Sequence, residues 1–261
     1  MSYIATAYQA KTMNSQGIID YSDQEHAVWH DLITRQQTII HKRACPEFIT
    51  GLAHLNLPED RIPQCHEVSA VLQDFTGWAL EPVPALISFN RFFELLANKR
   101  FPAATFIRTR EELDYLKEPD IFHEIFGHCP LLTHPAYAHC IESFGKLGLQ
   151  ANREERVLLA RLFWFTIEFG LINTPDGLRA YGGGILSSIN ETVYSLESPI
   201  PLYKAFSIHE ALRTPYQIDV IQPTYFVIDD LEQLFNLEPQ TLMAEIHQVR
   251  LGNQVSPHHP C

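Results

Sequence analysis

Hydrophobic residues recur at helical spacing over much of this chain of 261 residues. Segment 152–171 has the strongest pattern: it begins with acidic residues and is almost continuously apolar from Val157, as a buried helix is. In segment 22–44, Val28, Leu32 and Ile40 fall on one helical face behind an acidic start. The pattern predicts further helices over residues 45–55, where Pro46 suits a first turn, and over 62–75, 89–100 and 239–252, with Gly252 as the stop.

Strand signals are few and short, and they are expected at residues 104–109, 178–184 and 218–228. The chain is therefore predicted to be mainly α with small β elements (α+β), and not an alternating βαβ protein. No linker rich in Gly and Ser divides it, so we expect one domain over residues 1–261, with an N-terminal extension of about 20 residues (1–20) and a flexible tail (252–261). The glycine triplet 182–184 lacks a phosphate-loop pattern and is interpreted as a turn.

Composition narrows the class of protein. Hydrophobic residues make up 46% and charged residues 19%, which is typical of a soluble globular enzyme. The net charge of −12 argues against nucleic acid as a partner, and no apolar run approaches the roughly 20 residues that span a membrane. The N-terminus lacks a basic segment followed by an apolar one, so no secretory leader is expected. Five cysteines without a C-x-x-C pair argue against a disulfide framework and indicate a cytoplasmic location.

One stretch carries the candidate metal chemistry: "PDIFHEIFGHCPLL", residues 119–132. His123 and His128 are five positions apart, one more than in the zinc-protease motif H-E-x-x-H. On an undistorted helix this spacing separates the two side chains by about 140°, so both cannot bind one ion. Gly127 and Pro130 both disfavour a regular helix here. We therefore expect the helix to end or bulge, which would turn His128 back toward His123.

Glu168 is the third candidate ligand, since it lies in the apolar helix "LFWFTIEFGL". A carboxylate is costly to bury unless it is paired or bound to a metal, and an ion pair with Arg161 or Arg108 is the alternative interpretation. Two histidines and one carboxylate are the ligand set of non-haem Fe(II) oxygenases, although catalytic zinc uses the same donors. Cys129 is interpreted as a core residue because it directly follows His128.

Four segments together resemble the pterin-dependent aromatic amino acid hydroxylases. They are "FIRTREELDYLKEPDIFHEIFGHCPLL", "FWFTIEFGL", "AYGGGILSS" with Glu191 beyond it, and "IQPTYFVI". They occur in the family's order over about residues 87–228, and the match is closest to the short bacterial members. The resemblance implies a single catalytic domain with an open iron-containing basin.

The same resemblance implies a role for each site residue. His123, His128 and Glu168 would be the iron ligands, and Glu124 would be catalytic and reach the pterin through water. The cofactor side would include Phe92, stacked on the pterin, and Ile87. The substrate side would comprise Arg108, which binds the substrate carboxylate, Asp120, which orients Arg108, the ring-pocket residues Trp164 and Pro119, and also Phe169, Gly184 and Ser187.

Each role has a simpler alternative that the residues alone leave open. Arg108 could be an ordinary surface arginine, and Trp164 an ordinary core residue. Glu124 could be a solvated or capping carboxylate. Ser187 could cap the helix that follows it.

The implied reaction is the para-hydroxylation of L-phenylalanine to L-tyrosine, with Fe(II), tetrahydrobiopterin or a related reduced pterin, and O₂ as co-substrate. Tyrosine-preferring members have Asp where this chain has Ile218. Trp164 fits members that prefer phenylalanine or tyrosine better than members that prefer tryptophan. The alternatives are a preference for tryptophan or tyrosine, a zinc hydrolase with Glu124 as base, or an inactive protein that binds aromatic amino acids. We expect a monomer or a weak homodimer.

Overall fold

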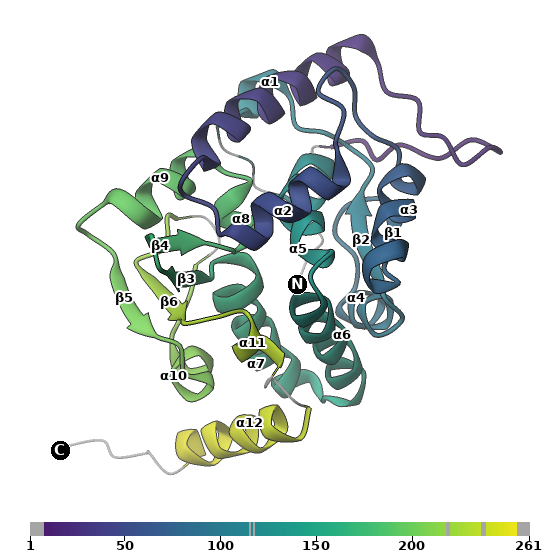
Figure 1. Ribbon diagram of the computed structural model, residues 1–261. Coiled ribbons are helices and arrows are strands. Elements are labelled where there is room, and N and C mark those ends of the chain that lie inside the picture. The colour runs from purple at the N-terminus through teal and green to yellow at the C-terminus, as the bar shows by residue number, and fades with distance from the viewer. Residues whose placement is uncertain (1–7, 115, 117, 218–219, 236–238, 255–261) are drawn as a thin grey trace.

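Helices form most of the computed structural model, which describes residues 8–114, 116, 118–217, 220–235 and 239–254 (Figure 1). The helices are α1 (Asp23–Ile40), α2 (Pro46–Leu55), α3 (Cys65–Thr76), α4 (Phe89–Ala97), α5 (Cys129–Leu132), α6 (Pro135–Gln150), α7 (Arg153–Phe163), α8 (Gly183–Leu186), α9 (Ile189–Glu197), α10 (Ile208–Arg213), α11 (Glu232–Phe235) and α12 (Pro239–Gln254). Among the described residues, a 3₁₀ turn, η1 (Arg110–Glu112), and two π-helices, η2 (His123–His128) and η3 (Trp164–Glu168), complete the helical set. None of the helices in this part of the chain combines the length and hydrophobicity needed to cross a lipid bilayer.

Two small sheets flank the helices α2, α5 and α6 (Figure 1). One pairs β1 (Ala79–Val83) with β2 (Arg100–Ala104) in parallel. The other has the order β4–β3–β6–β5, in which β3 and β4 are antiparallel and the remaining pairs are parallel. Its strands are β3 (Leu171–Thr174), β4 (Gly177–Ala180), β5 (Leu202–Ala205) and β6 (Thr224–Ile228). This mainly α arrangement with small sheets confirms the predicted fold class.

The predicted helices are present with small shifts at their ends. The capping box of Ser22 and Glu25 fixes the start of α1, and Pro46 occupies the first turn of α2 as expected. The stop predicted at Gly252 is wrong, because α12 continues to Gln254. Residues 1–7 and 255–261 lie outside the described residues, so the terminal segments expected at 1–20 and 252–261 stay predictions.

The strand expected over residues 104–109 is wrong, since β2 ends at Ala104. The following backbone groups find partners outside any sheet: Phe106 O accepts from Ile121 N at 2.9 Å, and Arg108 N donates to the Asp120 carboxylate at 2.9 Å. These bonds turn the segment toward the start of η2. The interpretation of the glycine triplet as a turn is also wrong, because Gly183 begins α8.

The sequence pattern missed α6, which is buried along most of its length and packs against α4. Two glycines permit this close approach. A Cβ atom at Gly145 would lie 2.2 Å from Ala97 N, and one at Gly148 would lie 2.2 Å from the Phe93 ring. Most buried hydrophobic side chains of the described residues form one cluster, which runs from Ile19 to Val249 and includes residues of both π-helices.

Candidate metal centre

The two histidines lie on η2, a π-helix that continues directly into α5. In a π-helix the backbone bonds join residues five apart, so His123 and His128 lie one turn apart on one face. The predicted bulge is therefore present, whereas the helix does not end. Gly127 lets α8 pack closely on this π-helix, since a Cβ atom there would lie 2.7 Å from Gly183 O. Pro130 lies in the first turn of α5, which follows η2 without a break, so its missing N–H leaves one backbone bond of the continuous helix unmade.

Glu168 reaches the histidines from η3, a second π-helix that extends α7. Helix α8 contacts both π-helices and holds them beside each other. The Nε2 atoms of His123 and His128 are 3.1 Å apart. The Glu168 carboxylate lies 3.6 Å from His123 Nε2 and 3.3 Å from His128 Nε2. The three predicted ligands therefore converge on one point, with donor atoms within 4.8 Å of one another.

These separations fit one metal ion. At bond lengths of about 2.1 Å, donors on adjacent corners of an octahedron are about 3.0 Å apart and donors on opposite corners about 4.2 Å. The two Nε2 atoms, 3.1 Å apart, fit adjacent corners, and the Glu168 carboxylate approaches them through its two different oxygens, at 3.6 Å from His123 and 3.3 Å from His128. Such a set binds one face of an octahedral ion and leaves the opposite face to other ligands, as in non-haem Fe(II) sites.

Hydrogen bonds orient both imidazoles. Ser187 Oγ donates its one proton to Gly183 O at 2.8 Å, so it accepts from His123 Nδ1–H, also at 2.8 Å. This tautomer leaves the Nε2 lone pair of His123 free for a metal. His128 Nδ1 lies 3.2 Å from the hydroxyl of Tyr137 on the buried helix α6. Both ligands thus have the supporting partners that metal-binding histidines usually have.

Burial and charge set the protonation of these groups. Burial lowers the pKa of His123 to about 4, so its imidazole is neutral and able to bind a metal near neutral pH. Burial opposes ionisation of Glu168, but His128 and His123 outweigh it and hold the pKa of Glu168 below its usual range. Burial, together with the charges of Glu168 and Asp120, raises the pKa of Glu124 well above its usual value.

Arg108 is a buried, oriented cation and not a surface arginine. Its Nε and Nη2 donate to the two carboxylate oxygens of Asp120 at 2.8 and 3.0 Å. Asp120 is fully buried, and although burial opposes its ionisation, Arg108 keeps its pKa below the usual range. Within the part of the chain that the structure describes, Nη1 makes only a long contact, 3.4 Å, to Leu113 O. The guanidinium therefore has one edge fixed by Asp120 and donors left for a second anion.

Aromatic side chains stand beside the acidic ligand. The ring centroids of Trp164 and Phe169 are 4.5 Å apart, and those of Trp164 and Tyr216 are 4.8 Å apart. Gly184 keeps this region tight, since a Cβ atom there would lie 3.0 Å from the Phe169 ring and 3.1 Å from Glu168 O. The predicted substrate residues Phe169, Gly184 and Ser187 thus lie against the ligands themselves.

A family model decides the class of protein. The model of the biopterin-dependent aromatic amino acid hydroxylases matches residues 1–246. This chain belongs to that family.

Similar proteins give the same result. The chain is 59% identical to the phenylalanine-4-hydroxylase of Pseudomonas aeruginosa over 248 residues, which are 95% of this chain and 94% of that protein. The solved apo structure of the cold-active phenylalanine hydroxylase from Colwellia psychrerythraea 34H has a TM-score of 0.92 at 53% identity, covering 94% of this chain and 95% of that one. The phenylalanine hydroxylase of Chromobacterium violaceum has been solved with bound Fe(III) and has a TM-score of 0.85 at 43% identity, covering 90% of this chain and 85% of that one.

A biopterin-dependent hydroxylase must hold a pterin beside its metal, and the predicted residues for this are Phe92, Ile87 and Glu124. Phe92, on α4, packs edge-to-face against Phe163 with centroids 5.6 Å apart. Phe163 directly precedes Trp164, so the predicted pterin and substrate walls are neighbours in the chain. Glu124 lies between the metal ligands on η2, and its carboxylate has no hydrogen-bond partner among the described residues. Ile87 is half-buried in the loop before α4.

Two residues of the hydroxylase site were not predicted. Tyr137 belongs to α6, which the hydrophobic pattern missed, so nothing pointed to it as the partner of His128. Tyr216 lies in an irregular segment whose sequence carries no signal for its contact with Trp164. Pro119 is half-buried next to Asp120, and its role in the ring pocket stays a prediction. Ile218 lies outside the described residues.

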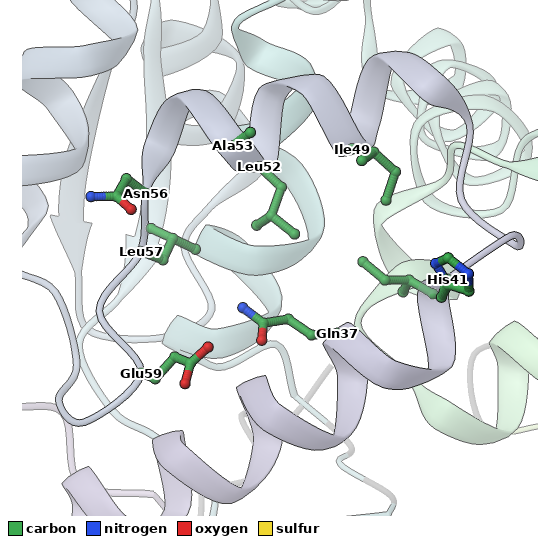
Figure 2. A pocket seen from close by; sticks show the side chains of 9 residues that line it. Gln37, His41, Ile49, Leu52, Ala53, Asn56, Leu57 and Glu59 are labelled. Carbon is green, nitrogen blue, oxygen red and sulfur yellow. The ribbon is translucent and has the colours of Figure 1, made fainter.

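A groove of about 430 Å³ lies elsewhere in the hydroxylase, beside α1 and α2 (Figure 2). Ile49 and Leu52 line it together with polar side chains such as Gln37 and Glu59. It contains none of the predicted site residues. The metal centre is therefore defined by its donor atoms and not by this groove.

Proposed function

We propose that this chain is a phenylalanine 4-monooxygenase that converts L-phenylalanine to L-tyrosine. The observation that carries the proposal is the position of Arg108, a buried cation with free donors, linked through Asp120 to the metal-binding helix. Relatives named phenylalanine-4-hydroxylase, 59% and 53% identical to this chain, support the choice of substrate. Fe(II) is the proposed metal and tetrahydrobiopterin or a related reduced pterin the proposed cofactor.

His123, His128 and Glu168 would hold Fe(II), which with the reduced pterin supplies activated oxygen from O₂. The other residues bind and orient the substrate. Arg108 would bind the α-carboxylate through its Nη1 side, because Asp120 occupies its Nε edge. Trp164, Phe169 and Pro119 would place the aromatic ring by offset or edge-to-face contact. A substrate that is held both at its carboxylate and at its ring presents one ring carbon to the metal.

The pterin side is proposed on the same basis. Phe92 would stack on the pterin ring, with Ile87 beside it. Burial raises the pKa of Glu124, and this carboxyl group would exchange a proton or a hydrogen bond with the pterin through water. Since no other side chain in the described part binds its carboxylate, Glu124 is available for this role.

The test is reconstitution of the metal-free protein with Fe(II) or Zn²⁺, followed by assay with a tetrahydropterin, O₂ and each aromatic amino acid. We expect tyrosine from phenylalanine with Fe(II) only, and loss of bound iron in His123→Ala and Glu168→Ala. Hydrolytic activity with Zn²⁺ and no O₂ consumption would refute the proposal. Preferred turnover of tryptophan or tyrosine would refute the choice of substrate, and normal iron content in both variants would refute the ligand assignment.

We also propose that the protein acts in the cytoplasm as one catalytic domain, and as a monomer or weak homodimer. Cys45, Cys65, Cys129 and Cys140 are free and buried, which suits a reducing compartment. Sedimentation at several protein concentrations tests the oligomeric state. A stable tetramer at the lowest concentration would overturn that part.

A further inference from the structure

Gln222 connects the aromatic wall of the site to the segment that precedes β6. It is buried, with 1% of its surface exposed. Its Oε1 accepts from the indole Nε1–H of Trp164 at 3.0 Å. Its Nε2 donates to the carbonyls of Gln217 and Val220, each at 2.9 Å. A buried amide with three hydrogen bonds has one fixed orientation, so it offers Trp164 an acceptor at a fixed position.

Gln222 is in turn anchored to two other elements. Its backbone N–H donates to Glu191 Oε1 at 3.3 Å, and the hydroxyl of Tyr225 donates to the same oxygen. Glu191 lies on α9 and Tyr225 on β6, and both side chains are buried. Burial raises the pKa of Glu191, because water no longer solvates its carboxyl group. The hydrogen bonds from the Gln222 N–H and the Tyr225 hydroxyl therefore stabilise this group more than they would at the surface. The backbone of Gln222 is therefore held by α9 and β6, while its side-chain amide is held by the carbonyls of the exposed residues Gln217 and Val220.

Trp164 needs such an acceptor to hold one orientation. Phe169 and Tyr216 contact its ring, but apolar contacts alone distinguish poorly between the two ring positions related by rotation about the last side-chain torsion. The bond to Gln222 favours one of them, because only that position places Nε1–H against Oε1. A hydrogen bond at the edge of the indole thus selects which way the ring faces.

We propose that Gln222 is a positioning residue for the aromatic ring of the substrate. Gln222 fixes the orientation of the Trp164 indole, against which the substrate ring lies. Glu191 and Tyr225 in turn hold Gln222 in place. The identity of the substrate in this inference rests on the proposed function. The orientation of Trp164 by Gln222 does not, and it is measured separately.

The first experiment follows the indole N–H groups of the ¹⁵N-tryptophan-labelled protein without metal or substrate. The sequence holds three tryptophans, so the signal of Trp164 is assigned as the one absent in Trp164→Phe. In Gln222→Met we expect its hydrogen exchange to accelerate about tenfold or more, the effect of losing one hydrogen bond. Trp29, whose indole N–H donates to Pro58 O at 2.8 Å, reports on global folding and is expected to be unchanged.

Gln36→Met is the matched control, since Gln36 is also a buried glutamine with bonds from Nε2, to Leu186 O and to Thr192 Oγ1. We expect it to leave the exchange of the Trp164 indole unchanged. Equal acceleration in both variants, or none in Gln222→Met, would overturn the positioning role.

The second experiment is a double-mutant cycle on turnover. Gln222→Met should lower kcat/KM for phenylalanine by about 3- to 10-fold and reduce the tyrosine formed per tetrahydropterin oxidised. In a Trp164→Phe background the same change should have little further effect, because Gln222 acts through the indole. Additive losses would overturn the inference. A wild-type enzyme that forms no tyrosine would refute the proposed function instead and leave the exchange experiment decisive for Gln222.

Discussion

The side chain of Arg108 and the backbone of His123 are bound to the same carboxylate, that of Asp120. Arg108 donates to both oxygens, and His123 N donates to Oδ1 at 3.0 Å. The proposed carboxylate-binding residue and the first residue of the metal-binding π-helix therefore share one buried anchor. If Arg108 binds the substrate as proposed, a displacement of Asp120 would change the distance between the substrate carboxylate and the metal, and with it the ring carbon that is hydroxylated.

Asp120→Asn tests this anchor. The change leaves the buried cation of Arg108 without a counter-charge, so we expect a loss of unfolding free energy of about 3 kcal/mol. The KM for phenylalanine should rise about 10-fold or more, because the guanidinium is no longer held for a second anion. Urea unfolding and steady-state kinetics measure the two effects. An unchanged KM in a folded variant would remove Arg108 and Asp120 from the substrate site.

The exposed ion pair of Arg61 and Glu67 contrasts with the buried pair of Arg108 and Asp120, and its contribution to stability depends on pH. Arg61 binds Glu67 through two hydrogen bonds of 2.8 and 2.7 Å and lowers the pKa of Glu67 from 4.5 to about 2. Because the folded pKa is below the unfolded one, this stabilisation is present above pH 4.5 and is lost as the pH falls toward 2. Glu67→Gln should therefore cost less than ~1 kcal/mol at pH 7 and still less at pH 2, where Glu67 is about half protonated, since both side chains are partly exposed. A larger loss at pH 2 than at pH 7 in urea unfolding would contradict this sign.

Much of the fold could be predicted because helix patterns and caps are local. The capping box of Ser22 and Pro46 at the start of α2 both mark their helices in the sequence. Helix α6 was not predicted because it is buried along most of its length and so lacks a clear polar face. It also contains Gly145 and Gly148, which weaken a helical signal but are required by its contact with α4. The segment after Ala104 has strand-like residues, but its hydrogen bonds go to Asp120 and Ile121, which no local pattern reveals.

The metal ligands could be predicted because their spacing conflicts with a regular helix. A separation of five between His123 and His128 requires a bulge if both bind one ion, and Gly127 makes the bulge possible. The partners of the site residues could not be found this way, since Tyr137 is 9 positions from the ligand His128 and Gln222 is 58 positions from Trp164. Such contacts depend on tertiary packing alone.

The hydroxyl groups behind the histidines should control metal affinity. Ser187→Ala removes the acceptor for His123 Nδ1–H, and Tyr137→Phe removes the partner of His128 Nδ1. Loss of such a partner usually lowers metal affinity about 10- to 100-fold, and we expect this for Co²⁺ and Fe(II) in each variant. Competition with a chelator measures it. Tyr203→Phe is the control, because it removes a tyrosine hydroxyl bonded to Ser195 O, and its metal affinity should equal that of the wild type.

Gly183→Ala should damage the metal centre without altering a ligand. A Cβ atom at Gly183 would lie 2.3 to 2.7 Å from three atoms of the His128 imidazole, closer than any stable contact. The ring is fully buried and bonded to Tyr137, so it cannot move without losing that bond, and α8 must shift away from η2 instead. We expect Co²⁺ affinity to fall at least about 10-fold and the unfolding free energy to fall by about 1–3 kcal/mol, as overpacking does. Gly184→Ala is the neighbouring control, since its Cβ would meet the nearest atom at 3.0 Å and the neighbours need to give only slightly. If both variants bound Co²⁺ as the wild type does, the close packing of α8 on His128 would not be what holds the imidazole in place.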